Sequence, residues 1–124
     1  MKKILMAIMM VTSLALMPAT AQAKKKYIDY GTMKCTAFCP CEECSEGYGR
    51  KCALEGRTCK SEHTIAVDPD VIDLSSKVKI GNKIYVAEDT GGQVVGDTID
   101  IFFDTHEEVV EFGVKHKRCW VVKG

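Results

Sequence analysis

The sequence lacks several features that mark common classes of protein. It has 17 basic and 17 acidic residues and therefore no net charge, so no excess of one sign points to a nucleic acid, which would call for a basic face. Proline occurs only 3 times in 124 residues, which excludes a proline-rich linker protein. No internal repeat is visible, which excludes a repeat array.

A long apolar run is also missing. The longest, Ile4 to Met17, has 14 residues, whereas a transmembrane helix needs about 20. This run follows two lysines and ends near the small residues Ala21 and Ala23, which is the pattern of a signal peptide. We predict that residues 1–23 are a signal peptide and that the protein is exported, to the periplasm or to the extracellular space and cell wall. A retained membrane anchor is the weaker alternative.

The remaining chain of about 100 residues is long enough for one domain. We expect a polar lead-in over residues 24–31 and a single domain over residues 32–124. We expect it to act as a monomer without a cofactor.

Cysteine is abundant, and six of the seven cysteines lie within residues 35–59. Disulfides are the usual supplement to the small core of an exported domain. A zinc site is the alternative, because Cys41 and Cys44 have C-x-x-C spacing. Export favours disulfides, so we predict no metal site and at least two disulfides, one of them joining Cys119 to the N-terminal group. Pairing and the fate of the odd thiol stay open. The candidates are Cys35, Cys39, Cys41, Cys44, Cys52, Cys59 and Cys119.

Short strand-like segments dominate the rest of the sequence. Alternating or continuous apolar residues predict strands near residues 32–38, 64–68, 77–81, 83–89, 98–103 and 118–122. Gly81 and Asn82 predict a hairpin turn. One helix is expected from Thr105 to Phe112, since Thr105 and Glu108 have capping-box spacing. The cysteine-rich segment is expected to be a stapled loop. This pattern favours an all-β fold, a small barrel.

Three aspartates occupy positions that a purely structural strand would give to other residues. Asp68 and Asp89 end predicted strands, and Asp100 lies inside one. Aspartate is depleted in strands, and a buried carboxylate without partners is costly. Each has a structural alternative: Asp68 could cap the turn at Pro69, Asp89 could form an Asx turn, and Asp100 could face solvent.

Three segments together resemble the three-aspartate (3D) domain of secreted bacterial cell-wall proteins. They are "CTAFCPCEEC", "TIAVDPDVIDLSSKV" and "YVAEDTGGQVVGDTIDIFFDTHEEVVEFG". That domain is similar to the catalytic barrel of the membrane-bound lytic transglycosylase A family. The resemblance implies a six-stranded double-psi β-barrel with one short helix and a disulfide-rich N-terminal loop.

The resemblance also implies an activity and its residues. The partner would be peptidoglycan, and the reaction would cleave the glycan bond between N-acetylmuramic acid and N-acetylglucosamine without adding water. Asp100 would be the acid and base, Asp89 its electrostatic helper and Asp68 an orienting group. Substrate contacts would come from Glu88, Thr90, Gly91, Gly92 and Lys77, although a solvated strand face is the alternative for Lys77.

One segment departs from the family pattern. Members usually carry a threonine-alanine-small-glycine segment before the second strand, where this chain has "KCALEGRTCKSEH". A non-catalytic glycan-binding barrel, a structural protein with the same barrel and an ordinary two-carboxylate hydrolase are therefore alternatives. His63 and His106 have no evident second ligand and are interpreted as surface residues, and Trp120 as a core aromatic.

Overall fold

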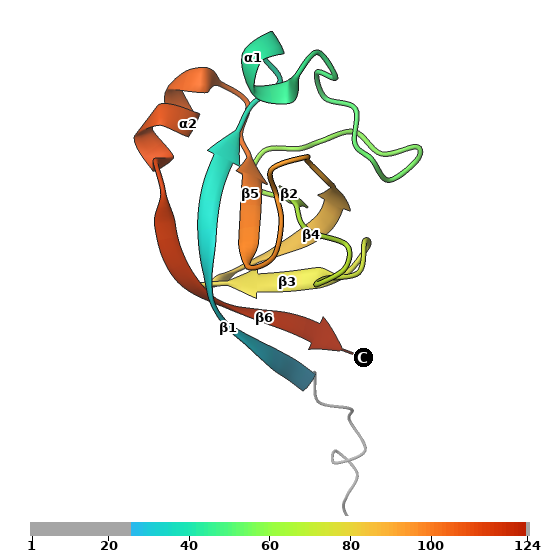
Figure 1. Cartoon of the computed structure of the whole chain (residues 1–124), viewed down its shortest axis with the longest axis vertical. Helices are drawn as coiled ribbons and strands as arrows, with labels where there is room; N and C mark the ends of the chain where they lie inside the picture. The colour runs from blue at the N-terminus through green and yellow to red at the C-terminus, as the bar shows by residue number, and fades with distance from the viewer. Residues whose placement is uncertain (1–25, 124) are drawn as a thin grey trace, which may run out of the picture.

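A computed structural model describes residues 26–123, and these form a closed barrel of six strands (Figure 1). The strands are β1 (Lys26–Phe38), β2 (Thr64–Ala66), β3 (Lys77–Ile80), β4 (Lys83–Asp89), β5 (Thr98–Phe102) and β6 (Lys115–Lys123). Their order around the barrel is β1-β5-β2-β4-β3-β6. The β1–β5 and β2–β4 pairs are parallel and the other four are antiparallel. The predicted fold class, a six-stranded double-psi barrel, is confirmed. The predicted signal peptide lies outside the described residues.

Two clusters of buried side chains lie on opposite faces of the sheet. Neighbouring side chains in a strand point to opposite faces, so Ile99 and Ile101 of β5 join the main core inside the barrel. Phe102 and Ala66 belong to a second cluster on the outer face, together with Cys52 and Cys59 of the cysteine-rich segment. The segment therefore packs over the outside of β2 and β5.

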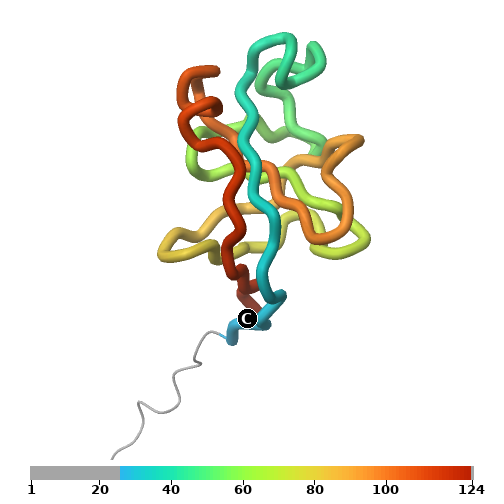
Figure 2. Tube along the Cα trace, turned by 60° about the vertical axis from the view of Figure 1, so that its left-hand side comes forward, coloured from blue at the N-terminus to red at the C-terminus, as the bar shows by residue number. Residues whose placement is uncertain are grey.

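Strand β1 is longer than predicted. Residues 26–31, expected to be a polar lead-in, are part of the strand and pair with β6, with Lys26 opposite Lys123. Figure 2 shows β1 and β6 side by side along their length. The partner strand lies about 90 residues away in the sequence, so the local polar composition gave no sign of this pairing.

Two helices, and not one, lie at the end of the barrel where β1 terminates (Figure 1). Helix α2 (His106–Phe112) was predicted, and both hydrogen bonds of its Thr105–Glu108 capping box are formed. Helix α1 (Glu42–Ser45) lies where a loop was expected. The Cys41 side chain caps it by accepting a hydrogen bond from the Cys44 N–H. Its single turn is too short to show apolar periodicity.

The expected disulfides are not formed in the structure: all seven cysteines are free. They nevertheless fall into three groups. The sulfur atoms of Cys52 and Cys59 lie 2.8 Å apart. Cys35 and Cys119 are both fully buried in the main core, and a shared hydrogen bond with Cys35 raises the pKa of Cys119. The other three cysteines lie near His106. Disulfides within the first two groups stay a prediction.

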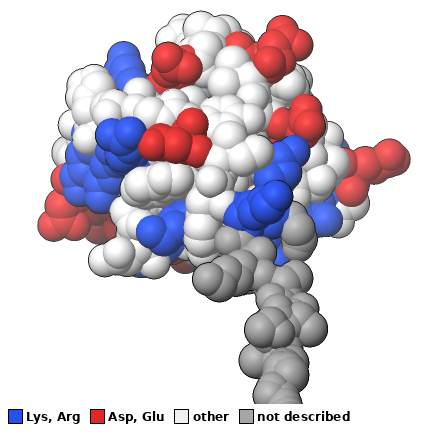
Figure 3. Space-filling view, turned by 90° about the horizontal axis from the view of Figure 1, so that it is seen from below, with Lys and Arg blue, Asp and Glu red and all other residues white. Residues whose placement is uncertain are grey.

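Charged side chains of both signs are interspersed on the face shown in Figure 3. No broad patch of one sign covers that face, as expected from the balanced composition. Within residues 26–123, none of the helices has the length and apolar character needed to cross a membrane.

The capping box makes helix α2 a testable element of the fold. Replacing Thr105 with alanine removes the oxygen that accepts the Glu108 N–H. We expect this change to lower the free energy of unfolding by about 1 kcal/mol in chemical denaturation. Thr105→Ser keeps the hydroxyl and should retain most of the stability. Equal stability of the alanine variant and the parental protein would contradict the role of the cap.

Candidate active site

A groove with a volume of about 860 Å³ lies over the outer face of the barrel. Its floor comes from three strands, with Phe38 at the end of β1, Ala66 at the end of β2 and Asp100 in the middle of β5. The cysteine-rich segment forms one side through residues 43–53, and residues 89–94 after β4 form the other. Two of the three predicted aspartates, Asp89 and Asp100, therefore line the same groove.

Asp100 is held at the groove floor by the strands on either side of β5. It lies opposite Thr36 of β1 and Ala66 of β2 in the strand register. The Thr36 hydroxyl donates a 2.8 Å hydrogen bond to Asp100 Oδ1. The pKa of Asp100 is raised to about 6, mainly by burial. The Thr36 hydrogen bond opposes this rise, and the nearby charge of Asp89 contributes to it. Asp100 thus holds its proton more tightly than an ordinary aspartate.

The apolar surroundings of Asp100 do not come from its neighbours in the sequence. Its neighbours Ile99 and Ile101 point into the barrel, because side chains alternate along a strand. The apolar side chains that line the groove with Asp100 include Phe38, Ala66 and Val94. Residues far apart in the sequence therefore create its environment.

Asp89 ends β4 and reaches the groove from its other side. Its Oδ1 accepts a 2.9 Å hydrogen bond from the Ala53 N–H. Burial raises the pKa of Asp89, and backbone hydrogen bonds from Thr90 and Ala53 oppose this rise. The Ala53 contact ties the segment that departs from the family pattern directly to a predicted site residue.

Asp68 is not among the residues that line the groove. Its two carboxylate oxygens accept hydrogen bonds from the N–H groups of Asp70 at 2.9 Å and Gly96 at 2.8 Å. These bonds, that from Gly96 above all, hold the pKa of Asp68 below its usual value. Asp68 therefore caps the turn after β2 and secures the loop before β5.

The predicted substrate contacts divide into two groups. Thr90, Gly91 and Gly92 line the groove. A Cβ atom on Gly91 would approach Val94 Cγ2 to 3.0 Å, so a side chain there would crowd the groove. Glu88 and Lys77 are not at the groove, which corrects their prediction.

The structure explains both exceptions. Glu88 is next to Asp89 in a strand, so its side chain points to the opposite face of the sheet. There it is buried, accepts a 2.7 Å hydrogen bond from the Thr64 hydroxyl and forms an ion pair with Arg57. Lys77 is exposed on β3, which pairs with β4 and β6 and does not border β5.

Sequence reasoning missed three residues of the site, two that line the groove and one that bonds to Asp100. Thr36 lies in a predicted strand, but nothing in the sequence indicates that it pairs with Asp100. Ala53 carries no polar side chain, and its contribution is a backbone N–H. Tyr48, 70% exposed at the groove, stands in the segment expected to be a loop. An aromatic residue in a polar segment was the one feature of the sequence that could have indicated a role for Tyr48.

The site has the elements of acid–base chemistry. A carboxyl with a pKa of about 6 can both donate and accept a proton near neutral pH. A second carboxylate nearby can favour protonation of the first and stabilise a developing positive charge. The groove and its exposed tyrosine suit a ligand with both polar groups and an apolar face.

Comparison with known proteins finds similarity to a described domain family. The model of the 3D domain matches residues 63–123, which confirms the resemblance seen in the sequence. The cell wall-binding protein YocH of Bacillus subtilis is 46% identical over 52 residues, or 41% of this chain, but the match covers only 18% of YocH.

Two solved structures are similar to the barrel. The crystal structure of MltA from E. coli matches with a TM-score of 0.49 and 18% identity, covering 60% of this chain and 28% of that one. The lytic transglycosylase LtgG of Burkholderia pseudomallei matches with a TM-score of 0.49 and 26% identity, covering 57% and 25%.

The environment of Asp100 can be measured directly. In an NMR titration of the carboxyl carbons we expect Asp100 to titrate near pH 6. Thr36→Val removes a hydrogen bond to the charged form, so it should raise this pKa further. Thr32→Val, on an exposed position of the same strand, should leave it unchanged. Titration of Asp100 near the ordinary value of 3.8 would contradict the burial argument.

Proposed function

We propose that this chain, whose residues 63–123 form a 3D domain, is an exported lytic transglycosylase that cleaves peptidoglycan between N-acetylmuramic acid and N-acetylglucosamine. The observation that carries the proposal is the placement of Asp100: a partly buried carboxyl, in a groove, with a pKa of about 6 and a second carboxyl on the opposite side. The family resemblance supplies the substrate, and the groove supplies room for a glycan strand.

The reaction needs one group that gives and then takes a proton. Protonated Asp100 donates its proton to the glycosidic oxygen as the bond to the muramic C1 breaks, and the departing sugar leaves as an alcohol. The Asp100 carboxylate then removes the proton from the 6-hydroxyl of the muramic residue, whose oxygen bonds to C1. The product is a 1,6-anhydro ring, Asp100 is protonated again, and no water is consumed.

Asp89 and Asp68 have different parts in this proposal. Asp89, as a carboxylate beside the groove, stabilises the positive charge that develops at C1 and favours the protonated form of Asp100. Asp68 acts through the backbone, because its bond to the Gly96 N–H holds the loop that leads into β5. Asp68 is thus a positioning residue.

The proposal predicts a defined pH dependence. The first step requires protonated Asp100, which is lost as the pH rises through about 6. Activity should therefore decline on the alkaline side of this value. At low pH, protonation of Asp89 would remove its charge, so activity should also decline on the acid side.

A second candidate function is a glycan-binding barrel without catalysis. The name of the relative YocH as a cell wall-binding protein favours it, and the unusual "CALEG" segment supports it further, because Cys52 and Ala53 of this segment line the groove. Both candidates use the same groove, and they differ in whether Asp100 turns over substrate.

Asp100→Asn tests the catalytic candidate. The substitution keeps the shape of the side chain but cannot cycle a proton, so the release of anhydromuropeptides from purified sacculi should fall at least about 100-fold. Binding to sacculi should be nearly unchanged. Asp97→Asn alters an exposed aspartate just before the same strand and should have the parental rate.

Stability provides the control for folding. Because the folded-state pKa of Asp100 lies above the ordinary value of 3.8, the parental protein loses stability as the pH rises from 3.8 to about 6. Asp100→Asn lacks this loss, so above pH 6 it should be at least as stable as the parental protein. A folded Asp100→Asn protein with near-parental turnover would eliminate Asp100 as the acid and base.

Tyr48 tests the groove as the binding surface. Its exposed ring suits stacking on a sugar, so Tyr48→Ala should weaken binding to sacculi by roughly 2- to 12-fold, which corresponds to about 0.5–1.5 kcal/mol for an aromatic contact. Tyr27→Ala is the matched control, since Tyr27 is 46% exposed on β1 and does not line the groove. Equal loss in both variants would count against this groove.

A further inference from the structure

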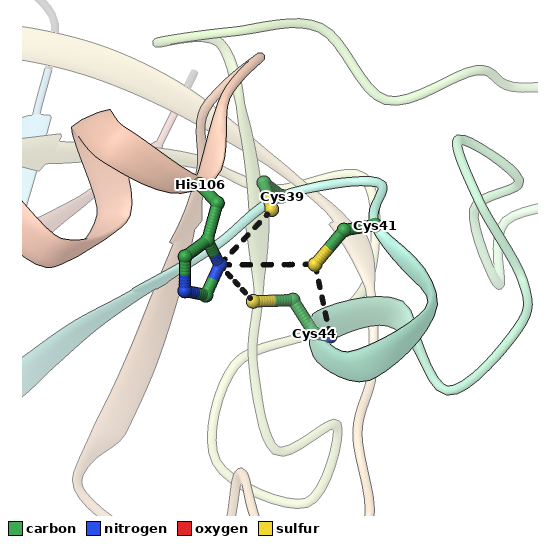
Figure 4. Close-up of side chains that lie close together, drawn as sticks. All are labelled: Cys39, Cys41, Cys44 and His106. Atoms are coloured by element: carbon green, nitrogen blue, oxygen red, sulfur yellow. Dashed lines mark hydrogen bonds between the residues drawn. The ribbon is translucent and has the colours of Figure 1, made fainter.

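Three cysteines and one histidine converge at the end of the barrel that carries both helices (Figure 4). Cys39 immediately follows β1, Cys41 is the N-cap of α1, and Cys44 lies within that helix. His106 is the first residue of α2. His106 is exposed, as the sequence analysis predicted, but the fold brings three potential co-ligands to it that the sequence did not reveal.

The geometry of the four groups matches a tetrahedral metal site. The sulfur atoms of Cys39, Cys41 and Cys44 lie 3.8, 3.7 and 3.4 Å from His106 Nδ1. All four candidate ligand atoms lie within 4.8 Å of one another. In a tetrahedral zinc site, bond lengths of about 2.3 Å to sulfur and 2.0–2.1 Å to nitrogen place the sulfur and nitrogen ligands about 3.6 Å apart.

Hydrogen bonding does not account for this convergence. A neutral imidazole nitrogen has a single lone pair, so Nδ1 can accept a hydrogen bond from one thiol, whereas three sulfur atoms point to it (Figure 4). A metal ion at the centre gives every one of these groups a partner at once. The backbone N–H of Cys44 also donates to Cys41 Sγ, a contact that stabilises a metal-bound thiolate.

From this arrangement we propose that Cys39, Cys41, Cys44 and His106 bind a structural zinc ion. Three thiolates and an imidazole in a tetrahedron favour zinc over harder cations. Because the chain supplies all four ligands, no position is left for substrate, and the site is structural. The expectation of no metal site is thereby revised.

The zinc site also accounts for the odd number of cysteines. Cys35 with Cys119 and Cys52 with Cys59 form two neighbouring pairs, and the remaining three cysteines are the proposed ligands. No thiol is left over.

The zinc ion would link the cysteine-rich segment to helix α2, because three of its ligands come from that segment and the fourth from the helix. Cys44, one of these ligands, also lines the groove. Zinc would therefore hold one side of the groove in place.

Metal analysis of the purified protein tests this inference. The reduced protein, incubated with zinc and then freed of excess metal, should retain one zinc ion per chain. Cobalt in place of zinc should give the intense visible absorption and the sulfur-to-metal charge-transfer bands of a tetrahedral thiolate site. Removal of zinc by a strong chelator should lower the temperature of unfolding.

Two variants separate this site from nonspecific metal binding. His106→Ala should weaken zinc binding by more than about 100-fold, beyond the loss expected for a supporting hydrogen bond alone. His116→Ala, which removes an exposed histidine of β6, should bind zinc as the parental protein does. The measurements on the parental protein decide the matter even if His106→Ala fails to fold.

Thiol counting distinguishes zinc from a disulfide within the cluster. After air oxidation in the presence of zinc, denatured and chelated protein should show the three thiols of the cluster. A disulfide between any two of them, or reduced protein that retains no zinc, would overturn the proposal. Sacculus binding and cleavage do not enter these tests, so the metal site and the proposed function stand or fall separately.

Discussion

Strand β5 lies between a parallel neighbour and an antiparallel one, and its pairing with both fixes the position of Asp100. The register places Thr36 of β1 and Ala66 of β2 beside this aspartate. Since side chains alternate, the same register sends Ile99 and Ile101 into the core. A shift of one residue would bury the carboxyl inside the barrel and expose two isoleucines. Barrel stability and the position of the candidate acid thus depend on one register.

The outer face of β5 alone would leave Asp100 open to solvent. The cysteine-rich segment covers this face, with Cys52 and Cys59 packed against Phe102 and the Ala53 N–H bound to Asp89. Burial is the main cause of the raised pKa of Asp100, and the segment is one of the elements that enclose the groove around this residue. The segment therefore contributes to the site twice: it forms one side of the groove, and its Ala53 N–H binds the second carboxylate. The proposed zinc site would fix the segment to helix α2.

The sequence predicted local features well and distant contacts poorly. The Thr105 cap, the hairpin at Gly81 and Asn82 and most strands follow from nearby residues, and their patterns are strong. The strand pattern favoured a small barrel, and the resemblance to the 3D domain added the number of strands and the double-psi type. The pairing of residues 26–31 with β6 and the Thr36 bond to Asp100 depend on residues more than 60 positions apart. His106 likewise meets its cysteines only in the folded chain. Strand alternation did distinguish Glu88 from Asp89, but the prediction did not apply it.

The central claim is that the groove performs a reaction in which the 6-hydroxyl of the substrate, and not water, replaces the departing sugar. The most direct measurement is digestion of purified sacculi by the protein in oxygen-18-labelled water, followed by mass spectrometry of the released muropeptides. Our account predicts 1,6-anhydro ends that carry no label. Reducing ends that carry the label would show hydrolysis instead, and binding without any released product would show a glycan-binding barrel; either result would contradict the claim.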